Sequence, residues 1–156
     1  MAQVIFSLVQ FAIEISILFT VVSLFGSPAW RYIFELPLLM LLLGLFAAGI
    51  GFALSVIYVY FRDLGYLWQI LLQIWFFATP IIYSPDLLHG RGSPWVERLA
   101  KANPMYGFTN SFRQVLYHGQ GVGGGTVLEL CAVTAVSLLA GLWIFKKMSR
   151  RLAEEL

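Results

Sequence analysis

The sequence is poor in charged residues, histidine and cysteine, and each scarcity argues against a class of protein. Only 12% of its 156 residues are Asp, Glu, Lys or Arg, whereas soluble domains carry about 25%. The single cysteine, Cys131, excludes both a disulfide framework and a thiolate metal site. The two histidines, His89 and His118, have no Cys, Asp or Glu at ligand spacing. We therefore expect no catalytic site, no metal site and no cofactor held by this chain.

Binding of nucleic acid or nucleotide is not indicated either. The formal net charge is only +2, and the basic residues form no patch outside the C-terminus, so nucleic acid is not an expected partner. The glycine-rich segment 119–125 lacks the Lys-Ser/Thr pair and the preceding strand that a phosphate-binding loop needs. We interpret this segment as a flexible connector that ends the helix before it, and we expect any energy source to lie on another chain.

The chain is rich in long hydrophobic stretches. Hydrophobic residues make up 60% of it, more than a chain of this size can hide from water. A helix needs about 20 apolar residues to cross the hydrocarbon core of a bilayer. Four stretches qualify, at about residues 4–25, 36–60, 64–83 and 126–145. The sequence therefore predicts an all-α, polytopic membrane protein with a single transmembrane domain over residues 1–156.

A polar-to-mixed region, residues 84–125, separates the last two spans. Residues 95–102 have the pattern of a short amphipathic helix. Asn103 followed by Pro104 is typical of an N-cap and the first position of a second helix, which is too short to span. We therefore predict a re-entrant helical pair at 95–118 on the outer side. The apolar and basic side chains that distinguish its second helix are Phe108, Phe112 and Arg113.

Four spans place the N-terminus, the turn at 61–64 and the C-terminus on the same side of the membrane. Basic residues divide equally between the two sides by count. The orientation rule, however, weighs charges close to the span ends, and a basic cluster directly follows the last span. We therefore predict a cytoplasmic tail over residues 146–156. The cluster consists of Lys146, Lys147, Arg150 and Arg151.

The first two spans carry stripes that a purely lipid-facing helix does not need. On the first span, Glu14 lies near mid-membrane, where an acid costs about 2.5–3.5 kcal/mol unless it finds water or a partner. Its stripe either lines a cavity or makes a hydrogen-bonded helix contact. On the second span, small residues at helical spacing predict a close helix–helix contact, within one subunit or between subunits. The polar stripe is Gln3, Ser7, Gln10 and Glu14. The small stripe is Gly44, Ala47, Ala48, Gly51 and Ser55.

The third span divides into two arcs of opposite chemistry. One arc is wholly aliphatic and suits lipid. The other mixes aromatic faces with amides, as a passage for a hydroxyl-rich, partly apolar solute requires; alternatively, its glutamines bond across a packed helix interface. This candidate substrate pathway consists of Tyr66, Gln69, Gln73, Phe76 and Phe77. The tryptophans Trp68 and Trp75, with Thr79, lie on a flank and are predicted to pack against other helices.

Four short motifs in this order resemble an ABC-2 type transporter permease, most closely the branch that exports O-antigen, capsule or teichoic-acid polysaccharides. They are the FRDL turn at 61–64, the helix end TPIIY at 79–83, the Asn103-Pro104 helix start and the exit FKKMSRR at 145–151. Together they cover essentially the whole chain.

The resemblance implies a homodimeric, six-span permease in the bacterial cytoplasmic (inner) membrane, bound to two cytoplasmic ATPase subunits that bind and hydrolyse ATP. The spans found here correspond to the third to sixth of that family. Arg62 and Asp63 would then face the ATPase, and residues 100–118 would form the outer gate. The aromatic lining of the family's channel agrees with the aromatic and amide arc. The implied substrate is a polysaccharide, free or lipid-linked, and the implied chain is not itself an enzyme.

The family also has an N-terminal amphipathic helix, two earlier spans and a coupling helix, and this chain starts after them. We therefore expect either a fragment of a longer permease or a second chain that supplies the rest. Three other interpretations stay open: an ABC-2 permease for drugs or lipids, a non-transporting membrane assembly subunit, and a membrane-embedded enzyme of glycan or lipid synthesis. The enzyme would need clustered carboxylates or histidines at an interface, which the sequence does not contain.

Overall fold

Most of the residues that the computed structural model describes are helical; the described residues are 2–24, 31–32, 34–61, 63–79, 98 and 102–154. No strand occurs in this part of the chain, which confirms the predicted all-α fold class. A π-helical segment, η2 (Gln114–His118), continues the second helix of the predicted outer pair. The α-helices are α1 (Ala2–Leu24), α2 (Glu35–Tyr60), α3 (Leu64–Ala78), α6 (Pro104–Arg113) and α7 (Gly124–Glu154).

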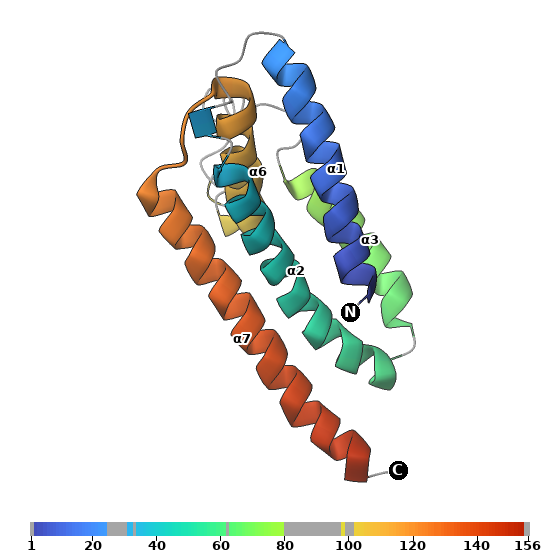
Figure 1. The fold of residues 1–156 in the computed structure, drawn as a ribbon. Helices are drawn as coiled ribbons and strands as arrows, with labels where there is room; N and C mark the ends of the chain where they lie inside the picture. Colours follow the sequence, from blue (N-terminus) through green and yellow to red (C-terminus); the bar gives the residue numbers. More distant parts are fainter. Residues whose placement is uncertain are drawn as a thin grey trace.

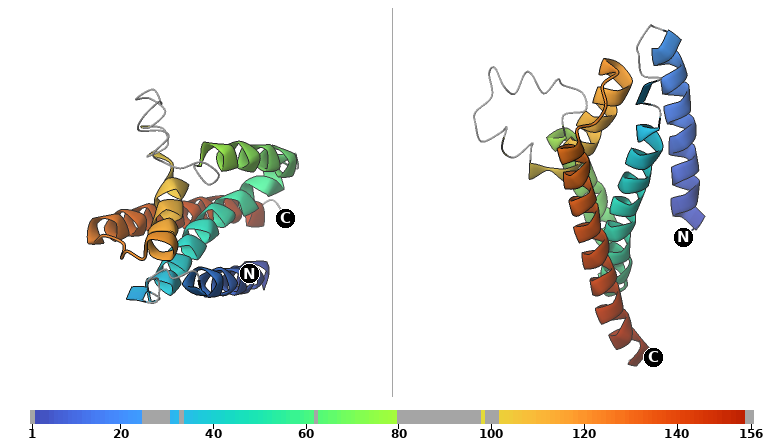
Figure 2. Two further views of the ribbon diagram at one scale, coloured as in Figure 1. Left: turned by 90° about the horizontal axis from the view of Figure 1, so that it is seen from above. Right: turned by 60° about the vertical axis from the view of Figure 1, so that its left-hand side comes forward.

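The helix ends are arranged as the predicted topology requires. The start of α1, the turn between α2 and α3 and the end of α7 lie toward one end of the molecule (Figure 1). Helix α6 lies toward the other end, against the first half of α7. Helices α2 and α7 run in the same direction beside each other, as the two views in Figure 2 also show. We refer to the end that holds α6 as the outer end, after the orientation that the sequence predicts.

Two helices are long and apolar enough to cross a membrane, namely α2 and the part Gly124–Ser149 of α7. The other two predicted spans are helical but have shorter apolar parts, Val9–Val21 and α3. Because the backbone of Thr79 is extended, α3 ends at Ala78 after 15 residues, or about 22 Å at 1.5 Å per residue. The four-span count therefore stays a prediction. The predicted extension to residue 83 lies outside the described residues from position 80 on.

The predicted C-terminal tail is an extension of the last helix. Helix α7 continues to Glu154, so the basic residues after position 145 stand on helical turns. The Nζ atom of Lys147 lies 4.6 Å from the centre of the Trp143 ring, within the range of a cation–π interaction. The first part of the basic cluster is therefore held on the helix, next to an aromatic side chain typical of membrane interfaces.

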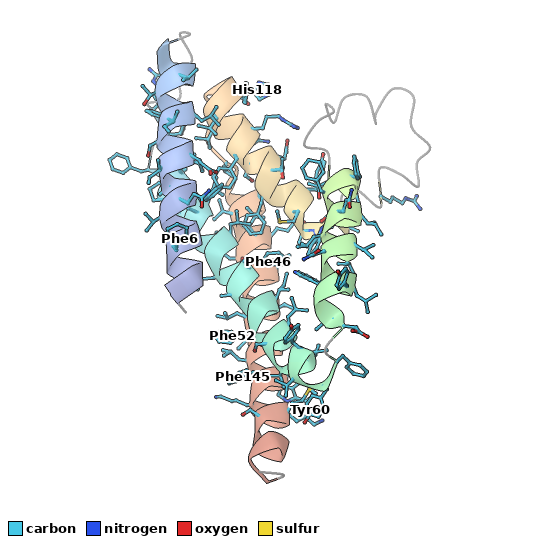
Figure 3. All side chains as sticks on the ribbon, turned by 90° about the vertical axis from the view of Figure 1, so that its right-hand side faces the viewer. Phe6, Phe46, Phe52, Tyr60, His118 and Phe145 are labelled. Carbon is cyan, nitrogen blue, oxygen red and sulfur yellow. The ribbon has the colours of Figure 1, made fainter. Side chains whose placement is uncertain are left out.

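The hydrophobic core occupies the outer half of the molecule. Phe46 of α2 lies at its centre (Figure 3); its ring centroid is 5.7 Å from that of Phe108 on α6 and 6.5 Å from that of Trp75 on α3. Three helices thus meet at one phenylalanine, while α1 joins through Ile15. The remaining buried residues of this core are Leu36, Leu39, Leu42, Val115, Leu116 and Leu130.

Glycines allow α2 and α7 to touch backbone to backbone. A Cβ atom added at Gly141 would overlap the carbonyl oxygen of Gly49, and one added at Gly49 would lie 2.6 Å from the carbonyl of Ser137. The hydroxyl of Ser137 donates to the Phe46 carbonyl oxygen at 3.0 Å, and that of Thr134 to the Leu42 carbonyl oxygen at 3.4 Å. Small and hydroxyl-bearing residues of this kind are typical of close helix contacts in membranes.

This contact lies on a different face of α2 from the predicted small-residue stripe. Gly51 of that stripe is exposed, and a Cβ added there would meet no atom within 4 Å. Within the described residues the close contact is therefore made by Gly49 and not by Gly51, while Gly44 of the stripe is buried. Contact of the stripe with another subunit stays a prediction. Gly49 lies about 160° around the helix from Gly51, at 100° per residue. It shares a face of α2 with the buried residues Leu42 and Phe46, and this is the face that packs against α7.

Candidate functional site

Helix α3 packs through the face that carries its tryptophans. Thr79, which caps α3, is 3% exposed and Trp75 is half-buried, whereas no residue within α3 itself is fully buried. Trp68, Leu72 and Trp75 line an open apolar cleft of about 440 Å³ between α3 and α2. The predicted packing role is therefore confirmed for Trp75 and Thr79, while Trp68 lines the open cleft. The two arcs beside this flank are left without contacts that bury them.

The predicted pathway residues form an exposed surface along α3. Tyr66 is 79% exposed and Phe77 63%; Gln69 and Gln73 are also exposed. Phe76 lies at the border, since it lines the cleft with α2 and packs edge-on against Phe77, with ring centroids 5.6 Å apart. We call Tyr66, Gln69, Gln73, Phe76 and Phe77 the aromatic–amide face. Its contact with a substrate stays a prediction.

The aliphatic arc of α3 is equally exposed. Ile74 is 64% exposed and Leu67 61%. Two exposed arcs of unlike chemistry thus flank one packing face on a single helix. An aliphatic arc is compatible with lipid tails, whereas exposed glutamine amides in hydrocarbon lack hydrogen-bond partners. The aromatic–amide face consequently needs water, substrate or another protein surface.

A hydrogen-bond network at Asn103 joins the end of α3 to the start of α6. The Oδ1 atom of Asn103 accepts from the indole N–H of Trp75 at 2.7 Å and from the backbone N–H of Met105 at 3.0 Å. Its Nδ2 atom donates to the Thr79 hydroxyl at 2.9 Å. The predicted N-cap at Asn103, with Pro104 at the first helical position, is confirmed. The sequence did not predict the two bonds to α3.

The other residues predicted for the re-entrant helical pair at 95–118, which we call the outer hairpin, contribute mainly to packing. Phe108 is 1% exposed in the core, and Phe112 packs edge-on against Phe11 of α1, with ring centroids 5.8 Å apart. Arg113 is the half-buried last residue of α6. The helix ends at His118, the predicted end of the pair, and Gly119 has a φ of 55°, which favours glycine. Of the predicted preceding helix, 95–102, only Arg98 and Ala102 are among the described residues, and both are helical.

Glu35 ties the connector after the hairpin to the start of α2. Its Oε2 atom accepts from the backbone N–H of Val122 at 2.7 Å. A Cβ atom added at Gly121 would lie 2.9 Å from Oε1 of Glu35 and 2.7 Å from the ring of Tyr32. The sequence analysis missed Glu35, whose signal was an acid at the first position of a membrane-length helix. This connector is therefore held in place, not free as predicted.

Replacing Glu35 with alanine should release the connector. A hydrogen bond to a charged group contributes roughly 1.5–3 kcal/mol, so we expect faster hydrogen–deuterium exchange of the Val122 amide and a free energy of unfolding lower by about 2 kcal/mol. Amide exchange followed by mass spectrometry on the purified chain measures the first effect. Glu154→Ala, near the far end of α7, is the control for loss of one acid. Unchanged exchange at Val122 in the Glu35 variant would contradict the tie.

Two of the remaining predicted charges, Glu14 and Asp63, lie on exposed surfaces. In α1 the side-chain amide of Gln10 donates to Oε1 of Glu14 at 3.0 Å; the side chains of Gln3 and Ser7 lie outside those described. The same holds for Arg62, while Asp63 precedes α3 and is exposed. Among the described residues, no group of three or more His, Cys, Asp and Glu could hold a metal ion.

Comparison with known proteins agrees with this architecture. A family model for ABC-2 type transporters matches residues 1–117, three quarters of the chain. The O-antigen export system permease protein RfbA of Myxococcus xanthus is 26% identical over 154 residues, which cover 98% of this chain and 58% of that protein. The protein of the same name from Klebsiella pneumoniae is 27% identical over 128 residues, 81% of this chain and 47% of that protein. The chain thus spans about half the length of the curated relatives that it matches.

Proposed function

Because this chain belongs to the ABC-2 type transporter family, we propose that it forms membrane-spanning helices of an ATP-driven exporter of polysaccharide or lipid-linked polysaccharide. The names of its relatives support this substrate class, since they are called O-antigen export permeases. The proposal includes a second copy of the chain, a separate cytoplasmic ATPase subunit that binds the ATP, and a place in the bacterial inner membrane.

The exposed aromatic–amide face of α3 is the observation that carries the proposal. Its rings are flat and its amides both donate and accept hydrogen bonds, which suits the alternating apolar and hydroxyl surfaces of sugars. No contact within the described residues buries it. In a homodimer this face would line the passage between the two copies, while Ile74 and Leu67 face lipid.

Helix α3 has the contacts expected of an element that transmits movement from an ATPase to the outer end. Asp63 is exposed at the inner end, next to the position of Arg62. At the outer end, Asn103 bonds α3 to the hairpin helix α6. One 15-residue helix therefore connects the charged turn that would meet the ATPase with the element that would form the outer gate.

Replacing Phe77 with alanine should slow export without preventing membrane insertion. We expect the Phe77 ring to contact the passing sugar and to lower the free-energy barrier of the rate-limiting step by about 1.4 kcal/mol. Its removal should then slow export roughly tenfold. Export is measured as polysaccharide reaching the cell surface in a strain that depends on the complete export system containing this chain. The amount of the chain in the membrane fraction is measured in parallel.

Ile74→Ala provides a matched control for this experiment. Ile74 is 64% exposed and Phe77 63%, but the two residues lie on different arcs of the same helix. We expect Ile74→Ala to leave the export rate within a factor of two. Equal export by both variants and the unaltered chain would remove the aromatic–amide face from the pathway.

A further inference from the structure

A second cavity lies between the hairpin helix α6 and the first half of α7. It is an open groove of about 770 Å³. Its open polar walls come from Tyr106 and Asn110 on α6 and from Thr126 and Glu129 on α7. Asn103 and Ser137 also line it, but their side chains form hydrogen bonds with other parts of the protein. Its apolar wall includes Val133 and Val136, and Val136 is 67% exposed. The groove therefore opens sideways, where a membrane helix meets lipid.

The polarity of the groove changes along its length as the polarity of a bilayer does. Helices α6 and α7 run in opposite directions (Figures 1 and 2), and Gly107 packs against Leu130. Asn110, Thr126 and Glu129 therefore line the same, outer end of the groove. If the span starts at Gly124, Glu129 lies about 8 Å below its start and Val136 about 18 Å below it. The headgroup layer is roughly 5–8 Å thick on each side. Glu129 is then at the border of the headgroups, and Val136 is among the acyl chains.

The charge of the groove selects the kind of headgroup. Among the described residues that line it, Glu129 alone carries a charge. An ionised carboxylate only accepts hydrogen bonds, and the amide of Asn110 and the hydroxyls of Tyr106 and Thr126 add further acceptors. A primary ammonium offers three donors and a positive charge. A quaternary ammonium has no N–H, and an anionic headgroup would meet the carboxylate with like charge.

We propose that this groove binds a phospholipid with a primary ammonium headgroup, the ethanolamine type. The ammonium lies against Glu129 and Asn110, and one acyl chain lies along Val133 and Val136. This site is separate from the aromatic–amide face of α3, and it requires only that the chain is in a membrane. It would fix the outer hairpin to α7 through a lipid that bridges both helices.

The test measures phospholipid binding to the purified 156-residue chain in detergent by native mass spectrometry. The probes are phosphatidylethanolamine, phosphatidylcholine and phosphatidylglycerol with identical acyl chains. We expect phosphatidylethanolamine to bind about tenfold more tightly than the other two, which is the difference in affinity that one charge-assisted hydrogen bond can provide. Glu129→Gln should remove this preference. Asp63→Asn, which removes an acid at the opposite end of the molecule (Figure 1), should keep the preference for phosphatidylethanolamine.

A second variant tests the acyl-chain part of the groove. Val136→Trp places a large side chain at an exposed position, so the chain should still fold, as its circular dichroism will show. We expect it to weaken binding of all three phospholipids to a similar degree. The proposal is overturned if the three phospholipids bind equally, or if Glu129→Gln keeps the preference. Tighter binding of a neutral oligosaccharide than of phosphatidylethanolamine would also overturn it, and would make the groove a sugar site.

Discussion

Replacing Asn103 with leucine is expected to separate the outer hairpin from α3. The change removes an acceptor for the Trp75 indole and for the Met105 backbone N–H, and a donor to the Thr79 hydroxyl. Loss of the N-cap costs about 1 kcal/mol, and each buried group left without a partner costs roughly 1–3 kcal/mol. We expect a free energy of unfolding lower by about 3 kcal/mol, measured by titration of the purified chain with SDS in mixed micelles.

Two further variants separate the cap from the link to α3. Serine is a good N-cap, but its short side chain cannot reach Trp75. Asn103→Ser should therefore recover only the part of the lost free energy of unfolding that is due to the cap. Trp75→Phe keeps the ring against Phe46 and removes only the indole N–H. If the network acts as one unit, the effects of Asn103→Leu and Trp75→Phe will be less than additive. Full additivity would show that the bond between these side chains contributes nothing.

Alanine at Gly49 or at Gly141 is expected to force α2 and α7 apart. Each new Cβ atom would meet the backbone of the facing helix, which cannot move out of the way as a flexible side chain can. Overpacking of this kind costs typically 1–3 kcal/mol, and separation also lengthens the bonds from Thr134 and Ser137 to α2. We expect each variant to lose about 3 kcal/mol in the same SDS titration.

Gly51→Ala is the matched control, two residues away on the same helix. Its Cβ atom would meet nothing within 4 Å, and alanine is favoured over glycine within a helix by about 0.5–1 kcal/mol. This variant should therefore be as stable as the unaltered chain or slightly more so. A stable Gly49→Ala variant, or equal losses at positions 49 and 51, would contradict the backbone contact between α2 and α7.

The sequence was most informative where the physical signal is local. Apolar length and composition indicated the helices, and Asn103 with Pro104 indicated the start of α6, because an N-cap depends on residues within one helical turn. Likewise, the glycine-rich segment correctly marked the end of the hairpin, where Gly119 takes a left-handed backbone. Family membership was also predicted from short motifs, since they are read without knowledge of the contacts.

The candidate site was predictable only as a set of faces on α3. Periodicity separated the aromatic–amide face from the aliphatic arc, because both repeat at helical spacing. Which face packs was a harder question, and the flank with Trp68 and Trp75 was identified from its residue types alone. The short reach of α3 was missed, since an apolar stretch does not reveal that the backbone becomes extended at Thr79.

By itself, the sequence determined that this protein is built of apolar helices with a capped helix start at Asn103 and a charged turn at 61–64, because those properties arise from the water-avoiding surface and hydrogen-bonding needs of neighbouring residues. Tertiary structure alone decided which surfaces meet. Gly49 faces Gly141 and Glu35 binds Val122 across 92 and 87 positions of the chain. Such contacts depend on the relative rotation and spacing of two helices, and a helix pattern does not encode that relation. The same packing leaves the aromatic–amide face and the groove at Glu129 open.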